Sequence, residues 1–89
     1  MNNKLFPEIN NSLPDATADA LLVKYASWQM EGKLAYKRSI GFGGWHTRNC
    51  TIPALQVKLQ EHVAKGDMVD VLNLAAMILV KQRLEEGKE

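Results

Sequence analysis

The chain has 89 residues, 46% hydrophobic and 24% charged, a balance typical of one globular domain and unlike that of a disordered chain. With 11 basic and 10 acidic residues the net charge is +1, so the basic excess of a dedicated duplex-DNA binder is absent. Cys50 is the only cysteine, which excludes an internal disulfide. Together with the lack of a signal-like apolar run near Met1, it predicts a cytoplasmic protein.

The first half of the chain is expected to hold an irregular leader and one helix. Residues 1–13 form the leader, because prolines and an Asn-Asn-Ser sequence interrupt it. The helix is expected over Pro14–Glu31, where apolar residues recur at helical spacing, with Ser12 as N-cap and Gly32 as stop. In residues 33–40 apolar positions alternate with polar ones, so this segment is either a short strand or a continuation of the helix past Gly32.

The second half predicts two helices joined by a very short turn. Gly41–Cys50 is expected to be a glycine-rich loop, and Thr51 to cap a second helix that Gly66 ends. Asp67 is expected to cap a third helix that continues to about Arg83. The fold class is therefore all-α.

This predicted fold is a small three-helix domain over residues 14–85. Its last two helices form an antiparallel hairpin, a glycine-rich loop precedes them, and residues 86–89 form a charged tail.

The third helix is the most apolar element, since only Asp70 and Asn73 are polar between Met68 and Val80. A helix that is apolar on nearly all sides is expected to be buried on nearly all sides. Two short neighbours offer too little cover, so the pattern predicts a homo-oligomer, most simply a dimer. The apolar stretch is too short to span a membrane, and no membrane partner is expected.

Asp70 and Asn73 lie three residues apart and therefore on one helix face. Three interpretations remain open for this pair. It is a polar pair that fixes the register of helix packing, an exposed stripe on an otherwise buried helix, or part of a functional site. The structural interpretations are favoured, because a buried polar group needs a partner.

The segment between Lys33 and Cys50 combines cations and aromatic rings and contains no acidic residue. Such mixtures contact phosphates and stack on bases, and they also dominate contacts between proteins. The first interpretation is that the rings are core residues within a solvated charged rim, and of the two functional alternatives protein contact is favoured over nucleic acid. The candidate partner-binding residues are Tyr36, Lys37, Arg38, Phe42, Trp45, His46 and Arg48.

Within Leu59–Ile78, Glu61 precedes a Gly-Asp turn, and Asp67 and Asp70 precede an apolar run. This segment, about a fifth of the chain, resembles the helical hairpin of MazG-like nucleoside triphosphate pyrophosphohydrolases. In that family Glu-x-x-Glu on one helix and Glu-x-x-Asp on the next hold magnesium. The resemblance implies that Glu61, Asp67 and Asp70 bind magnesium and serve catalysis, while Ala64 stands where the family has a fourth acid.

Three functions are therefore expected, in a definite order. The first is a small accessory or regulatory binding protein that contacts a host or phage protein and needs no catalytic residue, metal or cofactor. The alternative is a degenerate MazG-like pyrophosphohydrolase that uses magnesium, and the second alternative is a weak nucleic-acid binder. The phage or prophage type and the magnesium follow only from the resemblance.

Overall fold

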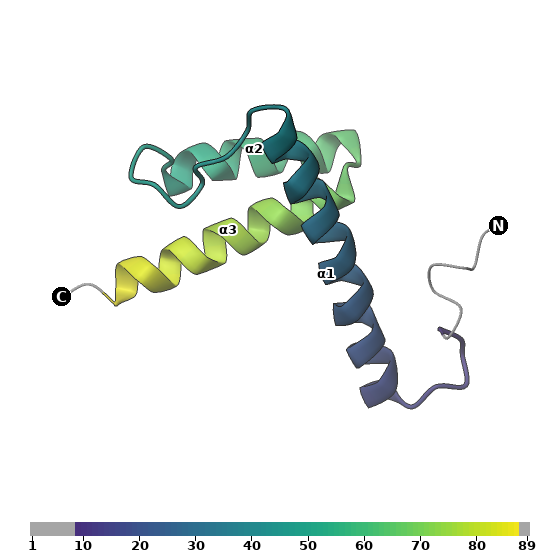
Figure 1. Cartoon of the computed structure of the whole chain (residues 1–89). Coiled ribbons are helices and arrows are strands. Elements are labelled where there is room, and N and C mark those ends of the chain that lie inside the picture. Colours follow the sequence, from purple (N-terminus) through teal and green to yellow (C-terminus); the bar gives the residue numbers. More distant parts are fainter. Residues whose placement is uncertain (1–8, 88–89) are drawn as a thin grey trace.

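A computed structural model describes residues 9–87, and within that range the chain forms three helices and no strand. Figure 1 shows α1 (Asp15–Ser39), α2 (Ile52–Lys65) and α3 (Met68–Glu86). The expected all-α fold with three helices is thus confirmed. Residues 1–8 of the expected leader and 88–89 of the expected tail lie outside the described residues.

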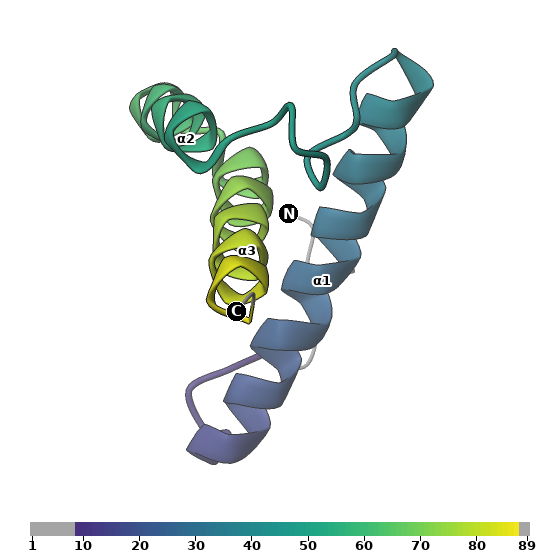
Figure 2. The same cartoon turned by 90° about the vertical axis from the view of Figure 1, so that its left-hand side faces the viewer.

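The three helices are arranged around α3. α2 and α3 form the expected hairpin, and α1 crosses the start of α3 so that its N-terminal half extends beyond the hairpin (Figure 1). Figure 2 shows α3 between the other two helices. In the described part of the chain α1 and α2 both pack against α3 and not against each other. The position of α1 therefore depends on what it contacts on α3.

The turn between α2 and α3 forms as the sequence predicts. The backbone N–H of Ala54 donates to the Thr51 side chain at 3.2 Å, which caps α2. Gly66 ends α2 in the left-handed conformation, with a φ of 81°. The backbone N–H groups of Gly66 and Asp67 donate to the carbonyl groups of Val63 and His62, so the turn satisfies the end of α2.

The prediction that Gly32 ends the first helix is wrong. α1 continues through it to Ser39, which resolves the ambiguity of residues 33–40 in favour of helix. Glycine in a helix costs about 1 kcal/mol relative to alanine, an amount that the contacts of the following turns with α3 can offset. The left-handed glycine that follows α1 is Gly41, with a φ of 98°.

Three details at helix ends also differ from expectation. The N-cap of α1 is Pro14, which has no side-chain cap, and Ser12 instead donates its backbone N–H to the Asn10 side chain. Asp67 stands at the N-cap of α3, but its carboxylate makes no capping bond and turns to His62. α3 ends at Glu86 rather than near Arg83.

The apolar core is small. Its cluster of buried residues, Leu55, Leu74 and Ile78, lies between α2 and α3, and Tyr25 of α1 is a further buried side chain. Partly buried side chains that pack against the cluster are Cys50, Ile52, Leu59 and Met77. Within the single chain α3 buries only one face, and Leu72 is 41% and Leu79 51% exposed, so the expected burial of the other sides in an oligomer stays a prediction.

Alanine substitutions at Gly66 and Gly32 make a matched stability test, because they are expected to change the free energy of unfolding in opposite directions. We expect Gly66→Ala to lower the free energy of unfolding by about 1–2 kcal/mol, because the φ of 81° strains any residue with a Cβ. Gly32→Ala should raise it by about 0.5–1 kcal/mol, because the helical Cβ meets nothing within 4 Å. Urea unfolding of both variants measures this, and a stabilising Gly66→Ala would contradict the turn geometry.

Candidate functional site

The carboxylate of Asp70 joins all three helices. Asp70 is only 8% exposed, and its two oxygens lie 3.5 Å from Lys33 Nζ and 3.8 Å from Lys37 Nζ on α1. His62 Nδ1 of α2 lies 3.6 Å from the same carboxylate. Lys33 and Lys37 are one helical turn apart, so both ammonium groups reach α3 from one face of α1. The buried carboxylate of Asp70 is thus one contact that places α1 on the hairpin, and Tyr25 of α1, which is 6% exposed, is the buried apolar side chain of that helix.

Asn73 adds a second polar contact between α3 and α1. It is 4% exposed, and its side-chain Nδ2 donates to the Met30 carbonyl oxygen at 3.3 Å. Its Oδ1 is buried and has no hydrogen-bond partner among the described residues. Because Asp70 and Asn73 both face α1, the alternative of an exposed polar stripe is wrong.

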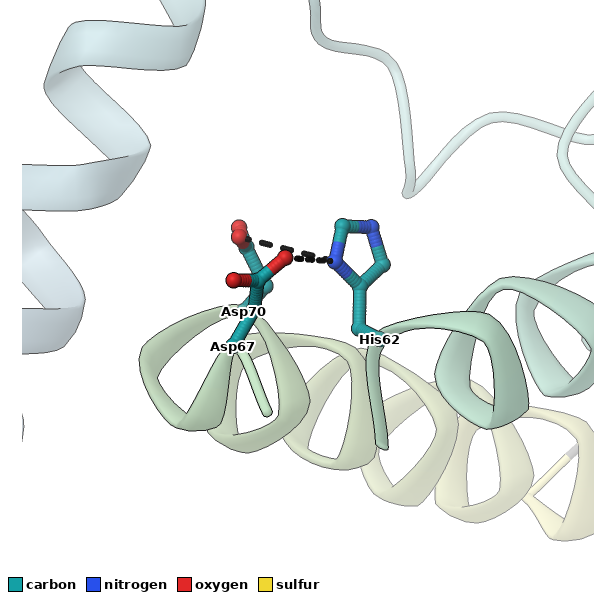
Figure 3. A group of neighbouring side chains, drawn as sticks. All are labelled: His62, Asp67 and Asp70. Carbon is teal, nitrogen blue, oxygen red and sulfur yellow. Dashed lines mark hydrogen bonds and ion pairs between the residues drawn. The ribbon is translucent and has the colours of Figure 1, made fainter. Parts of the chain in front are cut away.

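His62, Asp67 and Asp70 form a cluster at the corner of the hairpin. Figure 3 shows the His62 ring turned toward both carboxylates, with its Nδ1 3.1 Å from Asp67 Oδ2. One ligand-type atom of each residue lies within 4.8 Å of the others. Glu61, the remaining acid of the resemblance, is exposed and is not a member of this group. The structure therefore brings together two of the three predicted acids and adds an imidazole.

The charges around this cluster disfavour magnesium. Mg²⁺ is usually bound through one or two carboxylates together with water and substrate phosphates, and the cluster offers two carboxylates and one imidazole nitrogen. The ammonium groups of Lys33 and Lys37 already neutralise Asp70, the most buried carboxylate of the three. The residues present favour a charge-paired structural corner over the magnesium centre that the resemblance implies.

A groove of about 340 Å³ lies between the C-terminal half of α1, the 41–50 loop and the hairpin. Its apolar lining side chains, called the floor below, are Leu34, Leu55, Leu74 and Met77, and the polar Asp70 and Asn73 are as deeply buried as Leu55 and Leu74. Its cationic side chains are Lys37, Arg38 and Lys58, and its loop side chains include Phe42, Trp45, His46 and Cys50. The polar side chains His62, Asp70 and Asn73 also line it, so the Asp70 contacts form part of the groove.

The 41–50 loop forms one wall of the groove and is held by contacts with α1 and α3. Lys37 Nζ lies 5.2 Å from the centroid of the Phe42 ring, a cation–π contact at the end of α1. Lys81 of α3 is 8% exposed and donates from Nζ to the Thr47 carbonyl oxygen at 3.1 Å. Thr47 in turn donates from its hydroxyl to the carbonyl of Gly44, which has a φ of 80°. The loop is therefore a defined wall built on α1 and α3.

Five of the seven predicted partner-binding residues line the groove, namely Lys37, Arg38, Phe42, Trp45 and His46. Tyr36 lies instead beside Trp28 and Lys33 in an open hollow. Arg48 is exposed and is outside the groove lining.

Three polar residues of this region, Lys58, His62 and Lys81, are not among the site residues predicted from the sequence. A signal existed for His62, because it stands five residues before Asp67 across a glycine turn. No comparable signal marks Lys81, since a lysine near a helix end is ordinarily exposed.

Comparison with models of known families, with curated proteins and with solved structures finds no match to this chain. Within residues 9–87, no helix has an apolar stretch long enough to cross a bilayer. We therefore infer function from the side chains of the groove and of the corner cluster.

The anchor of the loop generates a prediction. Lys81→Met keeps the apolar stem but removes the hydrogen bond to Thr47, so we expect about 1 kcal/mol loss of unfolding free energy and faster amide exchange in the loop. Gln82→Met, at the exposed neighbouring position, is the control and should change neither. Unchanged exchange at the Thr47 and Cys50 amides in Lys81→Met would show that the loop is held by other contacts.

Proposed function

We propose that this chain is a small accessory binding protein whose groove takes an apolar side chain from an acidic segment of a partner protein. The observation that carries the proposal is the combination of an apolar floor with a cationic rim in one groove. Neither feature alone specifies a partner, but together they match a segment that presents an apolar anchor flanked by carboxylates.

The size and walls of the groove suit an anchor side chain. Its volume of about 340 Å³ is at the lower end of the range for small-molecule pockets, about 300–1,000 Å³. Phe42 is 59% exposed and Trp45 is half-buried, so both rings present surface to an incoming group. Aromatic side chains of this kind supply large contact areas at small cost in conformational entropy.

The charges around the groove favour an acidic partner. Arg38 and Lys58 are exposed at the rim, and neither is among the ion pairs of the described residues. Asp70, the carboxylate of the lining, is already neutralised by Lys33 and Lys37. The rim therefore keeps uncompensated positive charge, which accelerates encounter with an acidic segment and fixes its orientation.

The same observations rank the other two functions lower. A nucleic acid gains most of its affinity from many phosphate contacts, whereas the net charge is +1 and Arg48 lies outside the groove. A magnesium-dependent pyrophosphohydrolase ranks lower because Lys33 and Lys37 already pair with Asp70, one of the two carboxylates of the corner cluster. Protein contact remains the function that uses both the floor and the rim.

The proposal is tested by fluorescence titration with a short helical peptide that carries leucines one turn apart among glutamates. In a Trp28→Phe background, Trp45 is the single tryptophan reporter. We expect saturable binding that Phe42→Ala weakens through loss of apolar contact and that Arg38→Glu or Lys58→Glu weakens at least about tenfold, or about 1.4 kcal/mol.

Two controls make this test specific. Arg48→Glu makes the same charge change outside the groove and should leave the affinity unchanged. A peptide with lysines in place of the glutamates should not bind. Equal losses in Arg48→Glu and Arg38→Glu, or tighter binding of a single-stranded oligonucleotide than of the acidic peptide, would contradict the proposed function.

A further inference from the structure

The groove contains a hydrogen-bond acceptor that nothing in residues 9–87 satisfies. Asn73 lines the groove and is 4% exposed, and its Oδ1 receives no hydrogen bond from the described residues. A buried acceptor without a donor is costly, because it has lost its hydrogen bonds to water and gained none in return. Asn73 Oδ1 is therefore a point at which an occupant of the groove can gain a hydrogen bond.

The contact of Asn73 with α1 fixes which atom of its amide is the unpaired one. Nδ2 donates to the Met30 carbonyl oxygen at 3.3 Å. A carbonyl oxygen only accepts, so turning the amide over would bring two acceptors together and lose this bond. The amide is thus held in one orientation, with its donor used by α1 and its acceptor left for another group.

The other deep side chains of the groove do not supply a donor. Leu55 and Leu74, buried as deeply as Asn73, are apolar, and Lys37 pairs with the Asp70 carboxylate. The groove therefore combines an apolar lining with one unpaired acceptor. This is the usual composition of a specific binding pocket, in which apolar surface gives affinity and a few placed polar groups select the ligand.

We propose that Asn73 selects the anchor of the acidic segment, and that this anchor is a tryptophan whose indole N–H donates to Oδ1. The inference rests on the proposed function, because it names the side chain that the groove takes. Tryptophan has a large apolar ring for the floor and a single N–H donor, and it carries no acceptor that would need a partner of its own.

Other anchor side chains match the groove less well. Lysine and arginine donate, but they bring positive charge to a groove whose lining already includes Lys37, Arg38 and Lys58. A tyrosine hydroxyl brings an acceptor together with its donor, whereas the buried side-chain atom left unpaired among the described residues is itself an acceptor. Leucine and phenylalanine fill apolar space and leave Oδ1 without a donor. Tryptophan satisfies both the floor and Asn73.

Calorimetric titration of the native chain with two acidic peptides tests the donor. The peptides share their glutamates and differ only in the anchor, which is tryptophan in one and 3-benzothienylalanine, a similar ring with sulfur in place of N–H, in the other. We expect the tryptophan peptide to bind at least about tenfold more tightly. Equal affinities, or binding of the leucine peptide alone, would overturn the tryptophan anchor and leave the proposed function standing. No binding of any of the three peptides would overturn both.

Two variants test whether Asn73 is the acceptor. Asn73→Leu keeps the size of the side chain and removes Oδ1, so it should bind both peptides with equal affinity. Leu34→Ala, the control, removes apolar contact from the lining and should weaken both peptides by the same factor. A tenfold preference that survives in Asn73→Leu would overturn the proposal.

A measurement on the native chain covers the case in which Asn73→Leu does not fold. With ¹⁵N in the indole of the tryptophan peptide, its N–H proton should move downfield on binding, as a new hydrogen bond requires. An unshifted indole proton in the saturated complex would contradict the proposal.

Discussion

The ion pairs of the Asp70 carboxylate with Lys33 and Lys37 are the interaction on which the rest of the structure depends. The buried apolar cluster of Leu55, Leu74 and Ile78 lies between α2 and α3, and α1, which buries Tyr25, meets the described hairpin only through α3. Its crossing point coincides with Asp70 and with the Asn73 contact to Met30. A carboxylate that is 8% exposed is costly without counter-charges, so the position of α1 is the one that supplies them.

The groove is a consequence of that pairing. Lys37 approaches Asp70 and at the same time lies against the Phe42 ring, so the end of α1 and the start of the loop are positioned together. The other side of the loop is fixed by Lys81 through Thr47. Two buried polar contacts therefore define a surface that apolar packing alone would leave variable.

The fold was largely predictable because its signals are local. Thr51 and Gly66 delimit α2 by capping chemistry that needs no tertiary information. The prediction at Gly32 failed because it depended on tertiary contacts. A helix can continue through a glycine, here one with nothing within 4 Å of an added Cβ, when the turns that follow it pack against another element.

The candidate site was only partly predictable. Charge and aromatic composition marked five groove residues, but they cannot show that α1 turns Tyr36 away from the loop. His62 meets Asp67 only once the turn of the hairpin has formed. Lys81 bonds to Thr47, which is distant from it in the sequence. The resemblance placed Asp67 and Asp70 together, but it gave no indication of the lysines that neutralise Asp70.

The central claim is that Asp70 fastens α1 to the hairpin, and a double-mutant cycle between Asp70→Asn and the paired change Lys33→Met with Lys37→Met tests it most directly. We expect a coupling free energy of about 1 kcal/mol in urea unfolding, since the lysines are about one-third exposed and solvent screens them. The parallel cycle with Asp67→Asn should give coupling within about 0.3 kcal/mol of zero, because Asp67 pairs with His62. No coupling at Asp70, or equal coupling at both aspartates, would contradict the account.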